Sequence, residues 1–265
     1  MKDFATRYGP WAIVAGASEG IGAAFCDAIA GHGVNLVMIA RRVAPLEAAA
    51  DRLRTAYGVE IRPVSADLGS PQVGEALGPH LEGLDIGLLI YNACASTVGP
   101  FLETSLASKL ASVQVNCAGP LQLLALVQDG LVARGRGGVL LMSSLSGVVG
   151  TAMVSTYAAT KAYTQILGEG LWEELGPHGI DVLVSAPGAT RTPNWEAVTP
   201  EHKWEQAFPL TAADVAEHSL ARLAQGPVTV PGRLNAAVFF VMQRVLGRRA
   251  AIRFMSSNTR AIYTP

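Results

Sequence analysis

Residues 11–22 read WAIVAGASEGIG, a short apolar run that passes directly into closely spaced glycines. The first five residues have the length and character of a buried strand, and a helix is expected to follow over residues 21–32. Glycines at such a turn allow a tight bend and a close approach of the backbone to a pyrophosphate, to which the helix N-terminus presents free N–H groups. The pattern predicts a dinucleotide site, with a simple turn as the alternative, at Gly16, Gly20 and Gly22.

Similar apolar runs recur along the chain and alternate with helical stretches. Near-continuous apolar strands separated by helices indicate a parallel sheet that is covered on both faces. Right-handed crossovers then give an α/β fold with a doubly wound sheet in three αβα layers, and ligands bind at the carboxyl ends of its strands. Strands are expected at 11–15, 34–40, 61–65, 86–91, 138–142, 180–185 and 228–230, and further helices at 44–57, 211–225 and 234–246.

The 265 residues are 50% apolar and only 15% charged, with a formal net charge of −1, which suits one globular domain. Near-neutral charge lacks the basic footprint of a nucleic-acid-binding protein. The three cysteines and five histidines are scattered, so neither a disulfide set nor a metal site is expected, and the thiols are those of a reduced, cytoplasmic protein. No signal peptide is recognised, and no uninterrupted apolar run reaches the roughly 18 residues of a membrane span.

The C-terminal part of the chain has an unusual charge distribution. No acid follows Glu217, whereas seven arginines do. A dimer or partner surface is the simpler interpretation, and a basic surface that contacts anionic lipid is the other. We expect residues 1–232 to form the dinucleotide-binding and catalytic domain, with residues 233–265 as a basic extension packed on the same domain. A substrate loop is expected at 193–210, where two tryptophans favour an apolar substrate.

Three residues carry the expected chemistry. Tyr157 and Lys161 lie four residues apart, on one face of an expected helix, and Ser144 precedes the tyrosine by thirteen residues at the end of a strand. A phenol has a pKa of about 10, too high for acid–base work at neutral pH, and a nearby ammonium favours the phenolate. Ser144 can hydrogen-bond a substrate oxygen and stabilise the charge that develops there. The ordinary alternatives are a packed aromatic ring, a solvated lysine and a turn serine, but the upstream glycines favour catalysis.

Charged residues also follow the second and third expected strands. Arg41 and Arg42 come directly after the second strand, where an arginine accommodates a 2′-phosphate. Asp67 follows the third strand and can accept a hydrogen bond from an adenine amino group. A solvated arginine pair and an ordinary turn aspartate are the alternatives. The arginines favour NADP(H) over NAD(H) as the cofactor.

In the order and spacing of these motifs, the chain resembles a short-chain dehydrogenase/reductase over residues 8–232. The resemblance implies a Rossmann-type sheet, a nicotinamide cofactor and the family's catalytic set, with Asn116 helping to hold a proton-relay water. The family's P-G-x-x-x-T motif matches residues 187–192, where Thr192 would contact the nicotinamide carboxamide. The implied cofactor-binding residues are Gly16, Ser18, Gly20, Ile21, Gly22, Arg41, Arg42, Asp67, Leu68, Asn92, Ala93, Tyr157, Lys161, Pro187, Gly188, Thr190 and Thr192.

The chain departs from the family pattern at four places. Ala15 stands where threonine is usual, Tyr91 where an asparagine ties strands together, and Cys94 where a glycine lies beside the cofactor. The changes at Tyr91 and Cys94 imply a locally repacked backbone. Glu19 occupies a place where NADP-preferring members often carry a basic residue, so the expected NADP preference rests mainly on Arg41, with the next arginine in support.

The expected protein is an NADP(H)-dependent carbonyl reductase or alcohol dehydrogenase that acts on CH–OH groups, with an apolar ketone or secondary alcohol as substrate. Tyr157 is the expected general acid–base and Ser144 holds the substrate oxygen. Lys161 lowers the tyrosine pKa and reaches the ribose, while Asn116 positions water. The alternative is a catalytically silent protein that uses the fold for cofactor binding or assembly. The resemblance also implies a homodimer or homotetramer, formed through the helices that carry Asn116 and Tyr157.

Overall fold

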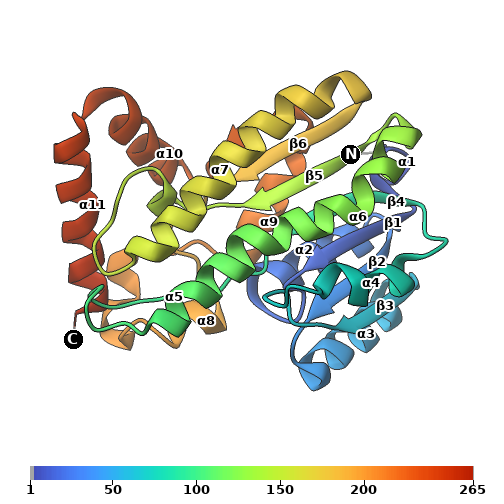
Figure 1. Ribbon diagram of the computed structural model, residues 1–265, viewed down its shortest axis with the longest axis horizontal. Coiled ribbons are helices and arrows are strands. Elements are labelled where there is room, and N and C mark those ends of the chain that lie inside the picture. The colour runs from blue at the N-terminus through green and yellow to red at the C-terminus, as the bar shows by residue number, and fades with distance from the viewer. Residues whose placement is uncertain (1–2, 265) are drawn as a thin grey trace.

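A computed structural model describes residues 3–264. Its centre is one parallel sheet of seven strands in the order β3-β2-β1-β4-β5-β6-β7, so the expected doubly wound sheet is confirmed (Figure 1). Each expected strand is present, with bounds that differ from the prediction by at most one residue. The strands are β1 (Trp11–Ala15), β2 (Asn35–Ala40), β3 (Ile61–Ser65), β4 (Ile86–Tyr91), β5 (Gly137–Met142), β6 (Ile180–Ser185) and β7 (Val228–Thr229).

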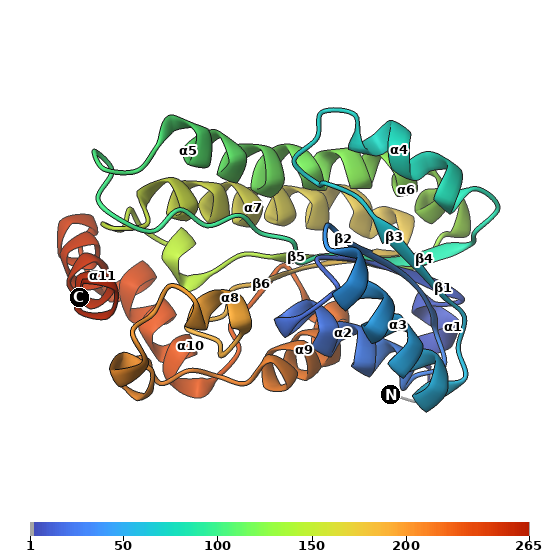
Figure 2. The same cartoon turned by 90° about the horizontal axis from the view of Figure 1, so that it is seen from below.

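Helices cover both faces of the sheet, which completes the three layers (Figure 2). Helices α4 to α7 lie on one face, and α2, α3 and α9 lie on the other. The helices are α1 (Phe4–Tyr8), α2 (Gly20–Ala30), α3 (Val43–Tyr57), α4 (Val73–Leu81), α5 (Leu106–Val113), α6 (Gly119–Arg134), α7 (Ser155–Leu175), α8 (Pro193–Glu196), α9 (Ala212–Ala221), α10 (Arg233–Phe240) and α11 (Arg248–Tyr263).

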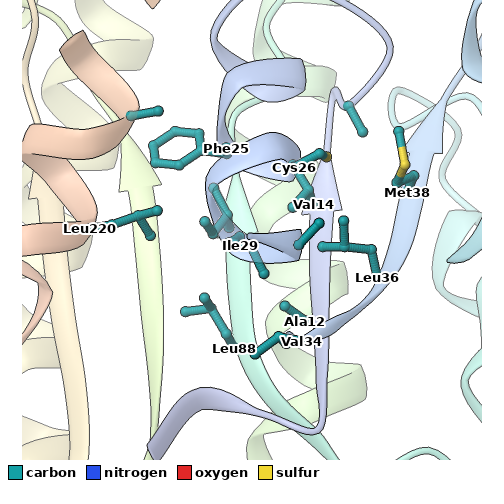
Figure 3. Close-up of a cluster of buried hydrophobic side chains, with 14 of the residues drawn as sticks. Ala12, Val14, Phe25, Cys26, Ile29, Val34, Leu36, Met38, Leu88 and Leu220 are labelled. Atoms are coloured by element: carbon teal, nitrogen blue, oxygen red, sulfur yellow. The ribbon is translucent and has the colours of Figure 1, made fainter. Parts of the chain in front are cut away.

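The two helical layers explain why the inner strands are apolar without alternation. Successive side chains of a strand point to opposite faces. Val14 therefore packs under α2 with Phe25 and Ile29 (Figure 3), whereas Ile13 packs with Leu123 of α6 on the other face. Both faces are buried, so every position of β1 requires an apolar residue.

The capping residues in the sequence predicted the start of α9 correctly. Thr211 caps α9, since its Oγ1 accepts from the Asp214 N–H at 3.0 Å, and Asp214 reaches back to the cap in a capping box. The helix expected at 234–246 is α10 followed by a π-helical turn, Val241–Val245. Helices α1 and α11 were not predicted from the sequence.

Helices α5 and α6 form one continuous helical run, Leu106–Arg134, through a π-helical turn at Gln114–Ala118. By length and composition this run is apolar enough to cross a membrane, with a mean hydropathy of 1.5. Core helices of soluble proteins pass the same test, and the run packs on the sheet through α6 side chains such as Leu123, Val127 and Leu131.

Candidate active site

A cavity of about 980 Å³ lies at the carboxyl ends of the strands. This volume is at the upper end of the roughly 300–1,000 Å³ usual for ligand pockets, so it can hold a cofactor and a substrate together. Its wall includes the glycine loop, the end of β2, the start of α7 and the C-terminal helix α11. The chain therefore forms one site from segments that are far apart in the sequence.

The glycine loop gives this cavity an anion-binding end. Helix α2 begins at Gly20, and Glu19 before it makes no side-chain cap. The N–H groups of a first helical turn have no partner within the helix, so they and the helix dipole suit a pyrophosphate. Gly16 and Gly20 both have positive φ angles, +82° and +58°. The loop residues that line the cavity are Gly16, Ser18, Glu19, Gly20 and Ile21.

Gly22 has a packing role in the structure and does not line the cavity. A Cβ at this position would overlap the carbonyl oxygen of Gly16. The absent side chain lets α2 lie against the end of β1. Gly22 is one of the three glycines predicted to bind cofactor. In the structure it positions the glycine loop and does not face the cavity itself.

The two arginines after β2 line the cavity but differ in their partners. The Arg42 Nη2 lies 2.5 Å from Glu19 Oε2, so this arginine is ion-paired with the glycine loop. Arg41 is exposed and makes no ion pair within residues 3–264. Arg41 is thus the arginine whose fork of donors is available to a phosphate.

The residues predicted beside the adenine and the ribose also border the cavity. Asp67 Oδ1 accepts from the Gly69 N–H at 3.0 Å, so the carboxylate holds its own turn and keeps its other oxygen for a ligand. Asn92 Nδ2 donates to the Gly16 carbonyl at 3.0 Å and ties the end of β4 to the glycine loop. Leu68 and Ala93 supply apolar wall.

The unusual Tyr91 is accommodated by a glycine on α6. Its hydroxyl donates to the Val115 carbonyl at 2.5 Å. A Cβ at Gly119 would overlap the Tyr91 oxygen, so the phenol occupies the room that Gly119 leaves. Cys94 lines the cavity as a free thiol. The departure from the family pattern at Tyr91 is therefore absorbed by local packing.

Ser144, Tyr157 and Lys161 meet at the cavity. Ser144 follows β5 in extended backbone, and its Oγ accepts from the Ser146 N–H at 3.2 Å. Tyr157 and Lys161 stand on the first two turns of α7. A Cβ at Gly147 would lie 2.8 Å from the Lys161 carbonyl carbon, so this glycine lets the turn after β5 touch α7. The close contact brings the serine and the tyrosine together.

Lys161 is almost fully buried, with 4% of its surface exposed. Its Nζ donates to the Met142 carbonyl at 2.7 Å and lies 5.6 Å from the centroid of the Tyr157 ring. An ammonium has three protons, so two remain for a ligand such as a ribose.

Burial is the largest effect on Tyr157 and raises the pKa of its phenol, while the hydrogen bond with Ser144 lowers it. From the sequence we expected Lys161 to lower the pKa of Tyr157. In the structure, burial of the phenol is the larger effect and raises this pKa, and the Lys161 ammonium donates a hydrogen bond to the Met142 carbonyl. The lowering by Lys161 stays a prediction for the site with cofactor bound.

Asn116 lies behind the cavity wall. It sits in the π-helical turn and is 2% exposed. Its side chain exchanges two hydrogen bonds of 2.8 Å with the backbone of Ala95 and donates to Thr160 Oγ1 at 2.9 Å. Both amide protons of Asn116 are used, and the side chain links the segment after β4, at Ala95, to Thr160 of α7. Its role in holding a water stays a prediction.

The segment after β6 forms a further part of the cavity wall, next to the turn that follows Ser144. Thr190 Oγ1 donates to the Gly188 carbonyl at 3.2 Å, and Pro187 accepts from the Leu145 N–H at 3.0 Å. Thr192 Oγ1 accepts from the Trp195 N–H at 3.2 Å and so caps the short helix α8. Pro187, Gly188, Thr190 and Thr192 all line the cavity.

The C-terminal helix contributes residues that sequence reasoning missed. Phe254, Met255, Asn258 and Tyr263 of α11 line the cavity. Nothing in their spacing marks them as site residues. The amphipathic pattern over 248–263 could have revealed the helix, but not its place beside Tyr157. The arginines of this part of the chain point outward, since all seven after Glu217 are exposed.

Comparison with known proteins identifies the family. A family model for short chain dehydrogenases matches residues 10–203. The chain belongs to this family. The resemblance inferred from the motifs is thereby confirmed, and the protein is an oxidoreductase by family. Among residues 3–264 of this dehydrogenase, no three His, Cys, Asp or Glu side chains gather as metal ligands would.

Relatives of this short-chain dehydrogenase include hydroxysteroid dehydrogenases. It is 32% identical to a 7beta-hydroxysteroid dehydrogenase of Collinsella aerofaciens over 86% of this chain and 88% of the relative. A solved structure from work on 7beta-hydroxysteroid dehydrogenase stereoselectivity matches 95% of this chain and 98% of its own, with 29% identity and a TM-score of 0.89.

Two further solved structures are similar to this chain over most of its length. A short-chain dehydrogenase from Sphingobium yanoikuyae, in complex with NADPH, is 29% identical, covers 90% of this chain and 96% of its own, and has a TM-score of 0.75. The bulky-bulky ketone specific alcohol dehydrogenase from Comamonas testosteroni is 30% identical and has a TM-score of 0.73. The match covers 93% of this chain and 98% of that chain.

Proposed function

We propose that this dehydrogenase uses NADP(H) to interconvert a bulky apolar ketone and the corresponding secondary alcohol. The observation that carries the proposal is the meeting of Ser144, Tyr157 and Lys161 in one cavity with Arg41 and the uncapped start of α2. The cavity thus has an anionic-ligand end and an acid–base end. The NADPH complex of the Sphingobium yanoikuyae relative supports this choice of cofactor.

Large, apolar substrates suit the walls of the acid–base end. Leu145, Val154, Val198, Phe208 and Met255 lie around it. A mostly apolar pocket with a few convergent polar groups is the usual form of a small-molecule site. The 7beta-hydroxysteroid dehydrogenase and the bulky-bulky ketone specific enzyme among its relatives support a substrate with at least two fused or linked rings.

The mechanism assigns a step to each side chain. Ser144 donates a hydrogen bond to the substrate oxygen and holds the carbonyl against Tyr157. Tyr157 gives its proton to that oxygen during reduction and takes it back during oxidation. Lys161, fixed by Met142, offers its other protons to the ribose and its charge to the tyrosinate. When bound, the nicotinamide supplies or accepts the hydride.

The competing proposal is a protein that binds cofactor without turnover. A fluorescence titration with NADPH, followed by a screen of bicyclic and steroid ketones with NADPH, separates the two. NADPH binding with ketone-dependent oxidation supports the enzyme. Binding without turnover, in a protein whose Tyr157→Phe variant behaves identically, supports the silent relative. A cytoplasmic location, a homo-oligomer and a weak membrane contact of the basic segment remain proposals from the sequence.

A further inference from the structure

Helix α11 is fixed to the turn that joins Ser144 to Tyr157. Ala152 in this turn donates its N–H to Ser256 Oγ at 3.0 Å, and its carbonyl accepts from Thr259 Oγ1 at 3.0 Å. Both polar side chains of α11 are buried. Below them Ala251 and Met255 pack in a small core with Leu145 and Val149, also from this turn. The helix lies at one edge of the molecule beside α10 (Figure 1), and its residues line the cavity.

The end of α11 crosses to the loop on the other side of the cavity. Lys203 donates through Nζ to the Thr264 carbonyl. Trp195 of α8 lies beside the Tyr263 phenol, close enough to lower its pKa. Trp195 is itself held by the Thr192 cap and by Trp204, whose ring centroid is 6.3 Å away. The wall and the substrate loop are therefore joined at Tyr263.

The Tyr263 hydroxyl retains a proton for the cavity. Within residues 3–264 the Tyr263 hydroxyl donates to no protein acceptor, so its proton is available to a ligand in the cavity that Tyr263 lines. Burial raises the pKa of Tyr263, so the phenol stays protonated at neutral pH. Tyr263 lines the cavity together with Tyr157 and is close enough for its charge to affect the Tyr157 pKa.

The reacting oxygen does not need this third donor. A carbonyl oxygen has two lone pairs, and Ser144 and Tyr157 fill both in the proposed mechanism. We propose that Tyr263 is a specificity-determining residue that donates a hydrogen bond to a second oxygen of the substrate. The substrate class is then a bulky apolar ketone or alcohol that carries a further hydroxyl, carbonyl or carboxylate oxygen. This inference rests on the proposed function of the same cavity.

The test uses Tyr263→Phe, which keeps the ring and removes only the hydroxyl. Tyr57→Phe on α3, far from the cavity, is the matched control. The ligands are decalone and a set of isomeric hydroxydecalones, in the presence of NADPH. Isothermal titration calorimetry in a Tyr157→Phe background gives their dissociation constants without turnover, and steady-state assays in the parent enzyme give KM and kcat.

The parent protein should bind at least one hydroxydecalone about tenfold more tightly than decalone, which corresponds to about 1.4 kcal/mol. Tyr263→Phe should abolish this preference through KM, leave the decalone and NADPH affinities unchanged, and Tyr57→Phe should change nothing. Trp195→Phe should reduce the preference partly, since it frees the Tyr263 ring.

Equal binding of all decalones by the parent protein, or an unaltered preference in Tyr263→Phe, would overturn the role of Tyr263. Weaker binding of decalone and hydroxydecalone alike in the variant would point to packing alone and would also overturn it. Absence of turnover with preserved hydroxydecalone preference would instead contradict the proposed reaction, so the two failures are distinguishable.

Discussion

The Arg42 guanidinium is paired with the Glu19 carboxylate at 2.5 Å, and the pair joins the end of β2 to the glycine loop beside the cavity. An acid at this place competes with a phosphate for the same arginine. The ion pair therefore sets how much of the positive charge after β2 reaches the cofactor.

Glu19→Gln should release Arg42 and tighten NADPH binding. Both side chains are substantially exposed, and exposed pairs contribute roughly 0–1 kcal/mol, so the gain should be at most about fivefold. NADH affinity should hardly change, because NADH has no 2′-phosphate. Fluorescence titration at low salt measures both constants, and an equal gain for NADH would show that the effect is not directed at the phosphate.

Arg41→Ala should remove most of the preference for NADPH. A charge-assisted contact with phosphate contributes about 1.5–3 kcal/mol, so the NADPH dissociation constant should rise roughly ten- to hundredfold while that of NADH stays constant. Arg52→Ala on α3, which breaks a pair with Asp27, is the control for loss of a positive charge elsewhere. Equal affinity of the parent protein for both cofactors would refute the assignment.

Tyr157→Phe should abolish turnover and leave NADPH binding nearly intact, because only the hydroxyl is lost. Lys161→Ala should damage both, and it should also destabilise the fold by about 1–3 kcal/mol, since the Met142 carbonyl loses its buried partner. Tyr163→Phe on the same helix is the control. Substantial activity in Tyr157→Phe would remove the mechanism. Urea denaturation measures the stability change.

The pH–rate profiles should differ between the two directions. Burial raises the pKa of Tyr157 above the ordinary value of about 10, so the proton donor form persists through neutral pH and carbonyl reduction should fall only in alkali. Alcohol oxidation needs the phenolate and should rise with pH. The positive charge of oxidised nicotinamide and Lys161 should bring its midpoint below that of a free tyrosine. A flat oxidative profile would contradict the acid–base role.

The raised pKa of Tyr157 should also make the stability of the fold depend on pH. A tyrosine whose pKa is higher in the folded than in the unfolded state contributes stability below the unfolded pKa, about 10, and this stability is lost as the pH rises further. The urea midpoint should therefore fall above about pH 10, and less steeply in Tyr157→Phe. An identical slope in both proteins would mean that other buried tyrosines, such as Tyr8 and Tyr91, account for the loss.

The helical run from α5 to α6 and helix α7 expose apolar side chains on the outer face of the molecule, which favours the expected homo-oligomer. Ile166 is 67% exposed and Trp172 is 41% exposed. Ile166→Glu should therefore lower the mass measured by light scattering, whereas Val43→Glu, on the opposite side of the sheet, should not (Figure 2). A monomeric parent protein at micromolar concentration would contradict the expectation.

The sequence predicted those parts of the fold whose signals are local. The inner strands β1, β4 and β5 were placed to within one residue because both of their faces are buried, which makes their sequences continuous apolar runs. The Thr211–Asp214 box marked α9 through a contact across three residues. The Ser256–Ala152 contact spans 104 residues, and no local pattern reports it. The same holds for the Arg42–Glu19 pair and for Tyr263, whose roles depend on which segments the fold brings together.

The residues at positions 91 and 119 depend on each other, because the Tyr91 side chain fits only against a glycine at position 119. The phenol of Tyr91 fills the volume that a side chain at position 119 of α6 would otherwise take. Its hydroxyl donates a hydrogen bond to the Val115 carbonyl of the π-helical turn. Grafting β4 from a relative with a smaller residue at position 91 would leave a void under α6. Grafting only an α6 that carries alanine at position 119 would place a methyl group on the phenol oxygen. Chimeras of this enzyme should therefore exchange β4 and α6 together.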